Sequence, residues 1–554
     1  MYNIYKSLSV KNIFAIRYKI SCIVLPATLL FILRFFFFIS VQGMASDSSR
    51  TILIEPGEKW WGGTVSDGYR MPFASGYHLN LLGDTRSNQA QPLLVSSHGR
   101  YIWSDEPFSF QMYTDSLVLE STFREGDTFI IGKAGNTLKD ACRYAGKTFF
   151  PASGRIPDEL MFIRPQYNTW IELVYNQNQK DVLKYARGII ENKFPAGVIM
   201  IDDNWQEDYG KWQFHPGRFS DPKSMIDSLH HMGFKVMLWI CPFISPDCDV
   251  YRRLRDDSLL IRDKSSREPA MIHWWNGVSA VLDLTHPDAM NWIKHQLSFL
   301  TDSMCIDGFK FDAGDAVFYS GDLECHSNIT PNEHSELYGQ LGLDYPLNEF
   351  RAIWKMGGQP LAQRLQDKRH NWEDLQTLIP NVLVQGLLGY PFTCPDLIGG
   401  GEFLSFIDLP SIDQDLVVRS AQCHALMPMM QFSVAPWRIL DEEHLKAIQK
   451  AIKIRARFSQ VILSLVKAAA TDGEPVVRSM EYVFPGKGYE QIKDQFMLGD
   501  SVLVAPMMSP GTGNRTVIIP QGKWLGDDGS MVRGPETITV HVPLDRLPCF
   551  RKIK

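Results

Sequence analysis

Acidic residues close several apolar, strand-like runs in the middle of this sequence: Asp202-Asp203, Asp312, Asp367 and Asp396. Two carboxyl groups in one site can divide acid–base and nucleophilic work, because one can stay ionised while the other holds a proton. An apolar run directly before each acid is typical of a buried strand that ends in a functional side chain. The pattern therefore predicts an active site built from carboxylates.

The segments around these acids alternate between two patterns. Apolar runs at 170–175, 196–202, 234–241 and 308–312 predict buried strands, and the stretches 180–193, 222–232 and 287–301 predict helices. Such alternation over roughly 270 residues fits a (β/α)8 TIM barrel, which usually takes about 250 residues. A doubly wound sheet also fits, but no Gly-rich phosphate loop follows the first strand. In a barrel, the acids would converge at the carboxyl ends of the strands.

Segments rich in predicted strands flank the barrel. Short alternating runs between residues 51 and 155, separated by Gly, Asp and Ser turns, are typical of an antiparallel sandwich. A helical stretch at 442–470 leads into further strand-like runs. We therefore expect an N-terminal β-sandwich at 46–160, the catalytic barrel at 161–440, and a connecting helix with a C-terminal β-sandwich at 441–554.

The first 45 residues have a different composition. Basic residues precede an apolar stretch at 20–41, and small residues follow it. This order is typical of a signal peptide, which predicts a secreted or periplasmic protein. An uncleaved N-terminal membrane anchor is the alternative, because the stretch is long enough to span a bilayer. Arg34 within the stretch weakens that alternative.

The composition indicates which kinds of ligand the protein could bind. The net charge is -6 and no long basic run occurs beyond the N-terminus, so nucleic acid is not expected as a partner. The cysteines form no CxxC pair, so no metal site is predicted. Trp274 and Trp275 are adjacent in a polar, Gly-containing loop. Indole rings stack on the C–H faces of sugars, so this pair predicts a sugar platform, although most Trp residues simply fill cores.

The neighbouring residues indicate what three of the acids could do. Lys310 and Asp312 would point to the same side of an alternating strand, where an ammonium favours an ionised carboxylate. The alternative is a structural Asp that caps the next helix. Asp315 could orient a neighbour or cap a helix. The charged stretch around Asp367, taken alone, is typical of a solvated loop.

The motif Lys310-Phe-Asp-Ala-Gly-Asp315 resembles the nucleophile motif of glycoside hydrolase family 31. Further similar segments lie at 201–205, 273–280, 378–400 and 427–433, so the resemblance covers about residues 165–437 and is weaker in the flanks. The family implies retaining α-glycosidases with an N-terminal β-sandwich, a barrel and C-terminal β domains. It implies a carbohydrate substrate and no cofactor.

By position, the resemblance implies that Asp312 is the nucleophile and Asp367 the acid/base. It also implies a set of substrate-binding residues: Asp202, Asp203, Trp239, Trp274, Trp275, Lys310, Arg364, Trp372 and Asp396.

The sugar is harder to predict. The nucleophile motif ends in Asp315 where this branch more usually has Glu, and Gln366-Asp367-Lys368 replaces the Gly-Asp-Asn of many α-glucosidases. The run 431–433 stands where those enzymes carry a binding His. An animal member of the branch acts on α-galactosides, so α-galactosidase is the leading prediction. α-Glucosidase, α-xylosidase, sulfoquinovosidase and transglycosylase remain alternatives. A non-catalytic carbohydrate-binding protein is disfavoured, because both candidate carboxylates are present.

Overall fold

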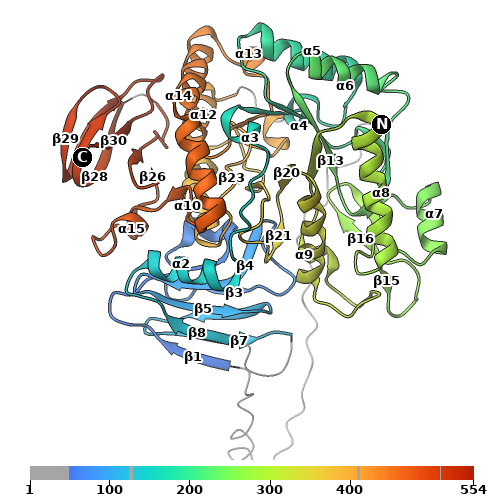
Figure 1. Ribbon diagram of the computed structural model, residues 1–554, viewed down its shortest axis with the longest axis horizontal. Helices are drawn as coiled ribbons and strands as arrows, with labels where there is room; N and C mark the ends of the chain where they lie inside the picture. The colour runs from blue at the N-terminus through green and yellow to red at the C-terminus, as the bar shows by residue number, and fades with distance from the viewer. Residues whose placement is uncertain (1–48, 124–128, 408–411, 512, 554) are drawn as a thin grey trace, which may run out of the picture. The chain divides into compact units, whose positions relative to one another are not determined.

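The structure is a computed structural model that describes residues 49–123, 129–407, 412–511 and 513–553 (Figure 1). The predicted signal peptide or membrane anchor at 1–45 lies outside the described residues. Within the described ranges, no helix combines the length and the apolarity needed to cross a bilayer. The chain from Ser49 onward forms one compact unit.

Eight parallel strands form the central sheet and follow one another in chain order: β9 (Gln166–Asn168), β10 (Val198–Ile201), β13 (Lys235–Ile240), β18 (Gly308–Phe311), β20 (Leu347–Phe350), β22 (Gln363–Arg364), β23 (Thr393–Cys394) and β24 (Gln431–Phe432). β24 pairs with β9. A parallel bridge between Leu397, just after β23, and Gln431 brings the two remaining edges together. The predicted (β/α)8 barrel is confirmed.

Helices surround this sheet (Figure 1): α5 (Gln179–Glu191), α6 (Pro222–His231), α8 (Pro287–Met304), α9 (Pro331–Leu341), α10 (Trp372–Leu387) and α12 (Gln414–Ala425). Helix α7 (Asp249–Asp256) belongs to the insertion between β13 and β18 and lies farther out. The residues at the start of α6 show why the helix begins there. Asp221 Oδ1 accepts from the backbone N of Ser224 over 3.1 Å, and Pro222 supplies the first turn. All four residues of β10 are buried, as expected for a strand covered on both faces.

The prediction of a strand at 170–175 is wrong. The first barrel strand is β9, which ends at Asn168, and Trp170–Leu173 forms the short helix α4. Asn168 Oδ1 accepts from the backbone N of Trp170 over 2.7 Å and turns the chain out of the sheet. Short apolar runs do not distinguish a strand from a helical turn, which is the source of the error.

The N-terminal part consists of two antiparallel sheets. One has the order β1 (Ser49–Leu53), β7 (Ser116–Ser121), β6 (Phe108–Met112) and β3 (His78–Asn80). The other has the order β2 (Trp60–Thr64), β4 (Gln89–Ser96), β5 (Arg100–Ser104) and β8 (Phe129–Lys133), with helix α2 (Leu138–Phe149) packed beside it. Strand β21 (Ile353–Trp354), which stands between barrel strands β20 and β22, pairs with β4. The second of these sheets is therefore joined directly to the barrel domain through β4.

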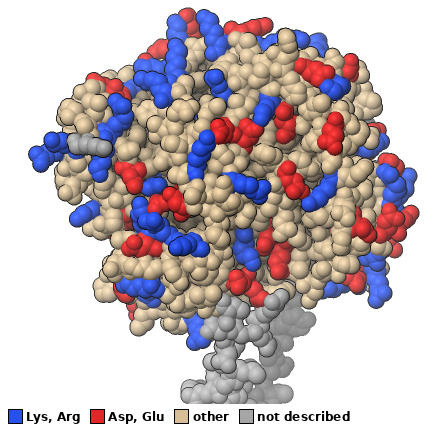
Figure 2. Space-filling model, in the orientation of Figure 1, with Lys and Arg blue, Asp and Glu red and all other residues tan. Residues whose placement is uncertain are grey.

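The long helix α14 (Glu442–Asp472) leads from the barrel to a C-terminal sheet. Its antiparallel strands are, in sheet order, β25 (Val477–Arg478), β26 (Phe496–Leu498), β27 (Val502–Val504), β30 (Cys549–Ile553), β28 (Gly513–Gly526) and β29 (Met531–Val542). The sequence predicted a sandwich here, whereas hydrogen bonds connect all of these strands into one sheet. Basic and acidic side chains lie interspersed over the face of the molecule shown in Figure 2.

Candidate active site

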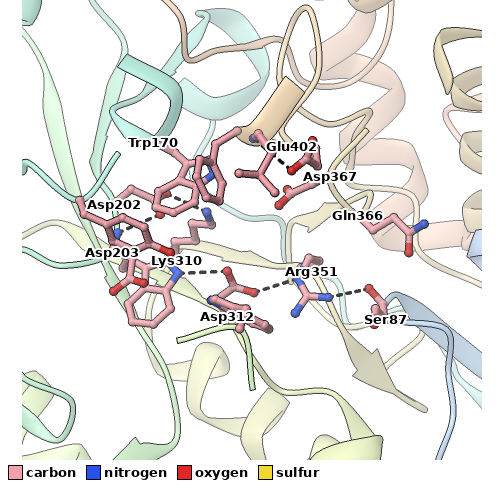
Figure 3. Close-up of a pocket in the computed structure, with 15 residues that line it drawn as sticks. Ser87, Trp170, Asp202, Asp203, Lys310, Asp312, Arg351, Gln366, Asp367 and Glu402 are labelled. Atoms are coloured by element: carbon pink, nitrogen blue, oxygen red, sulfur yellow. Dashed lines mark hydrogen bonds and ion pairs between the residues drawn. The ribbon is translucent and has the colours of Figure 1, made fainter. Parts of the chain in front are cut away.

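A cavity of about 520 Å³ opens at the carboxyl ends of the barrel strands (Figure 3). Its lining combines charged and aromatic side chains: Ser87, Trp170, Tyr175, Asp202, Asp203, Trp239, Trp275, Lys310, Asp312, Arg351, Gln366, Asp367, Glu402, Phe403 and Leu404. Six of them follow within three residues of the end of four barrel strands, which is where barrels place their functional groups: Asp202, Asp203, Asp312, Arg351, Gln366 and Asp367.

Asp312 follows β18 and points into this cavity (Figure 3). Its Oδ2 accepts from Trp239 Nε1 over 3.0 Å, and its Oδ1 accepts from Arg351 Nε over 2.9 Å. Burial acts to raise the pKa of Asp312, but the charges of Arg351, Lys310 and Arg364 outweigh burial and hold this pKa below its ordinary value. Asp312 is therefore an ionised carboxylate at the base of the cavity.

Lys310 takes part less directly than its spacing predicted. Its Nζ lies 2.7 Å from Oδ2 of Asp202, and both side chains are buried. Burial acts to lower the pKa of Lys310, but the charges of Asp202, Asp312 and Glu349 together outweigh burial and raise this pKa, so the ammonium keeps its charge. That charge also acts on Asp312.

Arg351 is a site residue that the sequence did not reveal. It follows β20, and its guanidinium donates to Asp312 and to both carboxylate oxygens of Asp315, over 3.1 and 2.7 Å. It also donates to the carbonyl oxygen of Ser87, from the N-terminal part, over 2.8 Å. Asp315 thus holds Arg351 in place, which is the orienting role considered for it.

The N-terminal sheet also fixes the backbone beneath the site. Asn88 Nδ2 donates to the carbonyl oxygen of Arg351 over 2.9 Å. Gln89 Nε2 donates to the same carbonyl oxygen and to that of Arg364, over 2.6 and 2.8 Å. These buried amides tie the ends of β20 and β22 together, which positions Arg351 and Arg364.

Asp367 lies across the cavity from Asp312 (Figure 3), with 40% of its side chain exposed. Its Oδ1 accepts from Arg364 Nη1 over 2.6 Å, and the same nitrogen donates to Oδ1 of Asp396 over 2.6 Å. Asp396 is fully buried, and burial raises its pKa. Arg364 and Asp396 are therefore placed behind Asp367 and outside the described lining of the cavity.

Asp203 lies in a second hydrogen-bonded group. Its Oδ2 accepts from Asn276 Nδ2 and, over 3.3 Å, from Tyr209 Oη. Burial and the neighbouring charge of Asp202 raise the pKa of Asp203 to about 7. Asn276 belongs to the turn between β16 (Met271–Trp274) and β17 (Gly277–Val281), so this group fixes that hairpin beside the cavity.

Of the four tryptophans predicted to bind substrate, two line the cavity and two do not. Trp239 and Trp275 line the cavity, and the ring of Trp275 lies 5.2 Å from the guanidinium of Arg351. Trp274 is buried behind Trp275. Trp372 begins α10 and donates to Asp413 over 2.9 Å, and it is not among the described residues that line the cavity.

The fold and the site together define a barrel protein whose carboxylates converge at the carboxyl ends of its strands. The family model of the "Glycosyl hydrolases family 31 TIM-barrel domain" matches residues 164–465, and that of the "Glycosyl hydrolase family 31 C-terminal domain" matches residues 473–553. The chain belongs to glycosyl hydrolase family 31, as the motif resemblance predicted.

Two curated relatives show the range of the family. The chain is 32% identical to "Myogenesis-regulating glycosidase" of Mus musculus, covering 74% of this chain and 59% of the relative. It is 25% identical to "Alpha-glucosidase 2" of Bacillus thermoamyloliquefaciens, covering 80% of this chain and 58% of the relative. The chain thus spans just under three fifths of the length of either relative.

Solved structures share the fold. A Flavobacterium johnsoniae GH31 dextranase complexed with glucose superposes with a TM-score of 0.81 at 19% identity, covering 91% of this chain and 66% of that chain. A GH31 alpha-xylosidase from a soil metagenome complexed with xylose superposes with a TM-score of 0.78 at 21% identity, covering 91% of this chain and 79% of that chain.

Proposed function

We propose that the protein is a retaining α-glycoside hydrolase that removes a terminal α-linked sugar through a covalent glycosyl-enzyme. The observation that carries this proposal is the pair formed by Asp312 and Asp367, which face one cavity from different strands. Membership of glycosyl hydrolase family 31 supports it. Retaining glycosidases use one ionised carboxylate as the nucleophile and a second carboxyl group as the acid/base.

The contacts assign the roles. Asp312 is the nucleophile, because Arg351 and Trp239 keep its carboxylate ionised and aimed at the cavity. Asp367 is the acid/base, because one of its oxygens is held by Arg364 while the side chain stays partly exposed to the cavity.

The reaction then proceeds by two displacements. Asp367 protonates the glycosidic oxygen as Asp312 attacks the anomeric carbon, and the leaving group departs as an alcohol. Asp367 next removes a proton from water, which attacks the same carbon and releases the sugar with its α configuration retained. Charged groups beside Asp312, namely Asp202, Asp203 and Lys310, suit the hydroxyl groups of the bound sugar.

For the sugar itself, α-galactoside is our first proposal. It rests on the motifs of the branch that this sequence resembles and on the departures from the α-glucosidase pattern at Gln366-Asp367-Lys368 and in the run 431–433. α-Glucoside and α-xyloside are the alternatives, because relatives at 25% identity are named "Alpha-glucosidase 2" and "Alpha-xylosidase XylQ".

A panel of aryl α-glycosides tests the proposal. The α-galactoside, α-glucoside and α-xyloside are offered to the wild type and to Asp312→Ala and Asp367→Ala. We expect release from one sugar and a loss of several orders of magnitude in the Asp312 variant. Near-normal turnover by Asp312→Ala would contradict the assignment of the nucleophile, and release from the glucoside or xyloside alone would replace the α-galactoside proposal.

A further inference from the structure

Two groups of side chains in the cavity lining differ in chemistry. Around Asp312 the lining is charged and hydrogen-bonded, through Asp202, Asp203, Lys310 and Arg351. A second group presents large apolar surfaces: Trp170, Tyr175, Phe403 and Leu404. We name these four residues the apolar wall. The hydroxyl groups of a sugar suit the first group, whereas the side chains of Phe403 and Leu404 offer no hydrogen-bond partner.

Packing between aromatic rings fixes this wall. The Trp170 ring lies edge-on to those of Phe403 and Tyr175, with centroids 5.3 and 5.5 Å apart. The Phe403 and Tyr175 rings are themselves 5.9 Å apart. Two segments that are distant in sequence, one after β9 and one after β23, therefore form one surface.

Leu404 extends this surface toward solvent. It begins the short helix α11 (Leu404–Ile407) and is 52% exposed. The carboxylate of Glu402 accepts from the backbone N of Leu404 over 3.1 Å and from that of Ser405 over 2.9 Å. Glu402 is thus engaged in holding the turn, and Leu404 is presented at the rim of the cavity in a fixed position.

The apolar wall adjoins Asp367. The backbone N of Glu402 donates to the carbonyl oxygen of Lys368 over 3.0 Å. A Cβ atom at Gly401 would lie 2.8 Å from Oδ1 of Asp367, so this segment passes directly beside the carboxyl group. In Figure 3, Glu402 and Asp367 lie next to each other at the edge of the cavity. An acid/base must contact the glycosidic oxygen, so groups just beyond it face the leaving group.

We propose that the apolar wall binds the leaving group, and that the preferred substrate is an α-glycoside of an apolar alcohol with an alkyl or aryl chain. The inference rests on the proposed function for the order of groups along the cavity. An exposed Leu at a cavity rim gains by being covered with an apolar group, and the aliphatic side chain of Leu404 has no polar atom to pair with a sugar hydroxyl group.

Two matched ligands test this proposal: the octyl and methyl α-glycosides of one sugar, in the galacto and gluco series. Binding is measured on the Asp312→Asn protein, so that turnover is not needed. In the preferred series, we expect octyl to bind at least about tenfold more tightly than methyl. Adding Leu404→Asn should reduce that advantage about five- to tenfold without weakening methyl. The matched control is Ile407→Asn, which changes an exposed residue of the same helix that is outside the described lining and should change neither ligand.

The result that overturns the proposal is equal binding of octyl and methyl glycosides in both series, an equal loss in the Leu404 and Ile407 variants, or no binding of either ligand. Hydrolysis of the same pair by the wild type is scored separately. An octyl advantage that depends on Leu404 without hydrolysis would support the apolar wall while contradicting the glycosidase proposal.

Discussion

Nε of Arg351 lies 2.9 Å from Oδ1 of Asp312, and the two residues follow the neighbouring strands β20 and β18. Both side chains are buried, so their attraction is weakly screened by solvent. The barrel thereby places a fixed positive charge against the carboxylate that we assign as nucleophile.

Replacing this arginine should change the pH dependence of the reaction. In Arg351→Gln the pKa of Asp312 rises because the adjacent guanidinium charge is lost. Activity needs the ionised form, so the acidic limb of kcat/KM moves to higher pH, and the rate at neutral pH falls by about 10²-fold. Rate profiles from pH 3 to 8 check this, with Arg351→Lys as the variant that keeps the charge. An acidic limb that stays in place in Arg351→Gln would show that Arg351 does not set the ionisation of Asp312.

Asp203 should make stability depend on pH. Its pKa is about 7 in the folded protein and about 3.9 in an unfolded chain, so the folded state holds the proton more tightly. Stability is therefore lost as the pH rises between these two values. Asp203→Asn removes that loss. The melting temperature of the variant minus that of the wild type should therefore increase by several degrees as the pH rises from 5 to 8. A constant difference across this range would contradict the raised pKa.

Gly401 should be required for the position of Asp367. A Cβ atom there would lie 2.8 Å from Oδ1 of both Asp367 and Asp396, closer than such contacts normally come. We expect Gly401→Ala to lower kcat by about tenfold or more, because a displaced acid/base transfers its proton poorly. Gly513→Ala is the matched control, since a Cβ there meets nothing within 4 Å. Unchanged turnover in Gly401→Ala would mean that Asp367 tolerates the displacement.

The sequence predicted the barrel, and it predicted Asp202 and Asp312 at strand ends, because these signals are local. Each of these two acids directly follows a short strand whose residues are all buried. The role predicted for Asp367 rests on the family resemblance instead. The helix predicted at 442–470 is confirmed as α14, with Asp441 as its N-cap. Such features depend on residues that are adjacent in the sequence, so they can be predicted from the sequence alone.

Arg351 could not be found in the same way. Its strand, β20, reads Leu-Asn-Glu-Phe, and the buried Asn348 and Glu349 hide the apolar pattern of a strand. Partners from other segments of the chain bond these polar groups: Gln431 donates to Glu349 over 2.7 Å, and Asn348 accepts from the backbone N of Ala362 over 2.9 Å. The apolar wall likewise joins segments that only the fold brings together.

The most direct test of the account is to trap the glycosyl-enzyme. The wild type is incubated with a slowly hydrolysed fluorosugar fluoride of the accepted sugar, and the protein and its peptides are analysed by mass spectrometry. The account predicts one added fluoroglycosyl group, bound through an ester to Asp312, and no label in Asp312→Ala. A label on another carboxylate, or turnover that releases the sugar with inverted configuration and leaves no label, would contradict it.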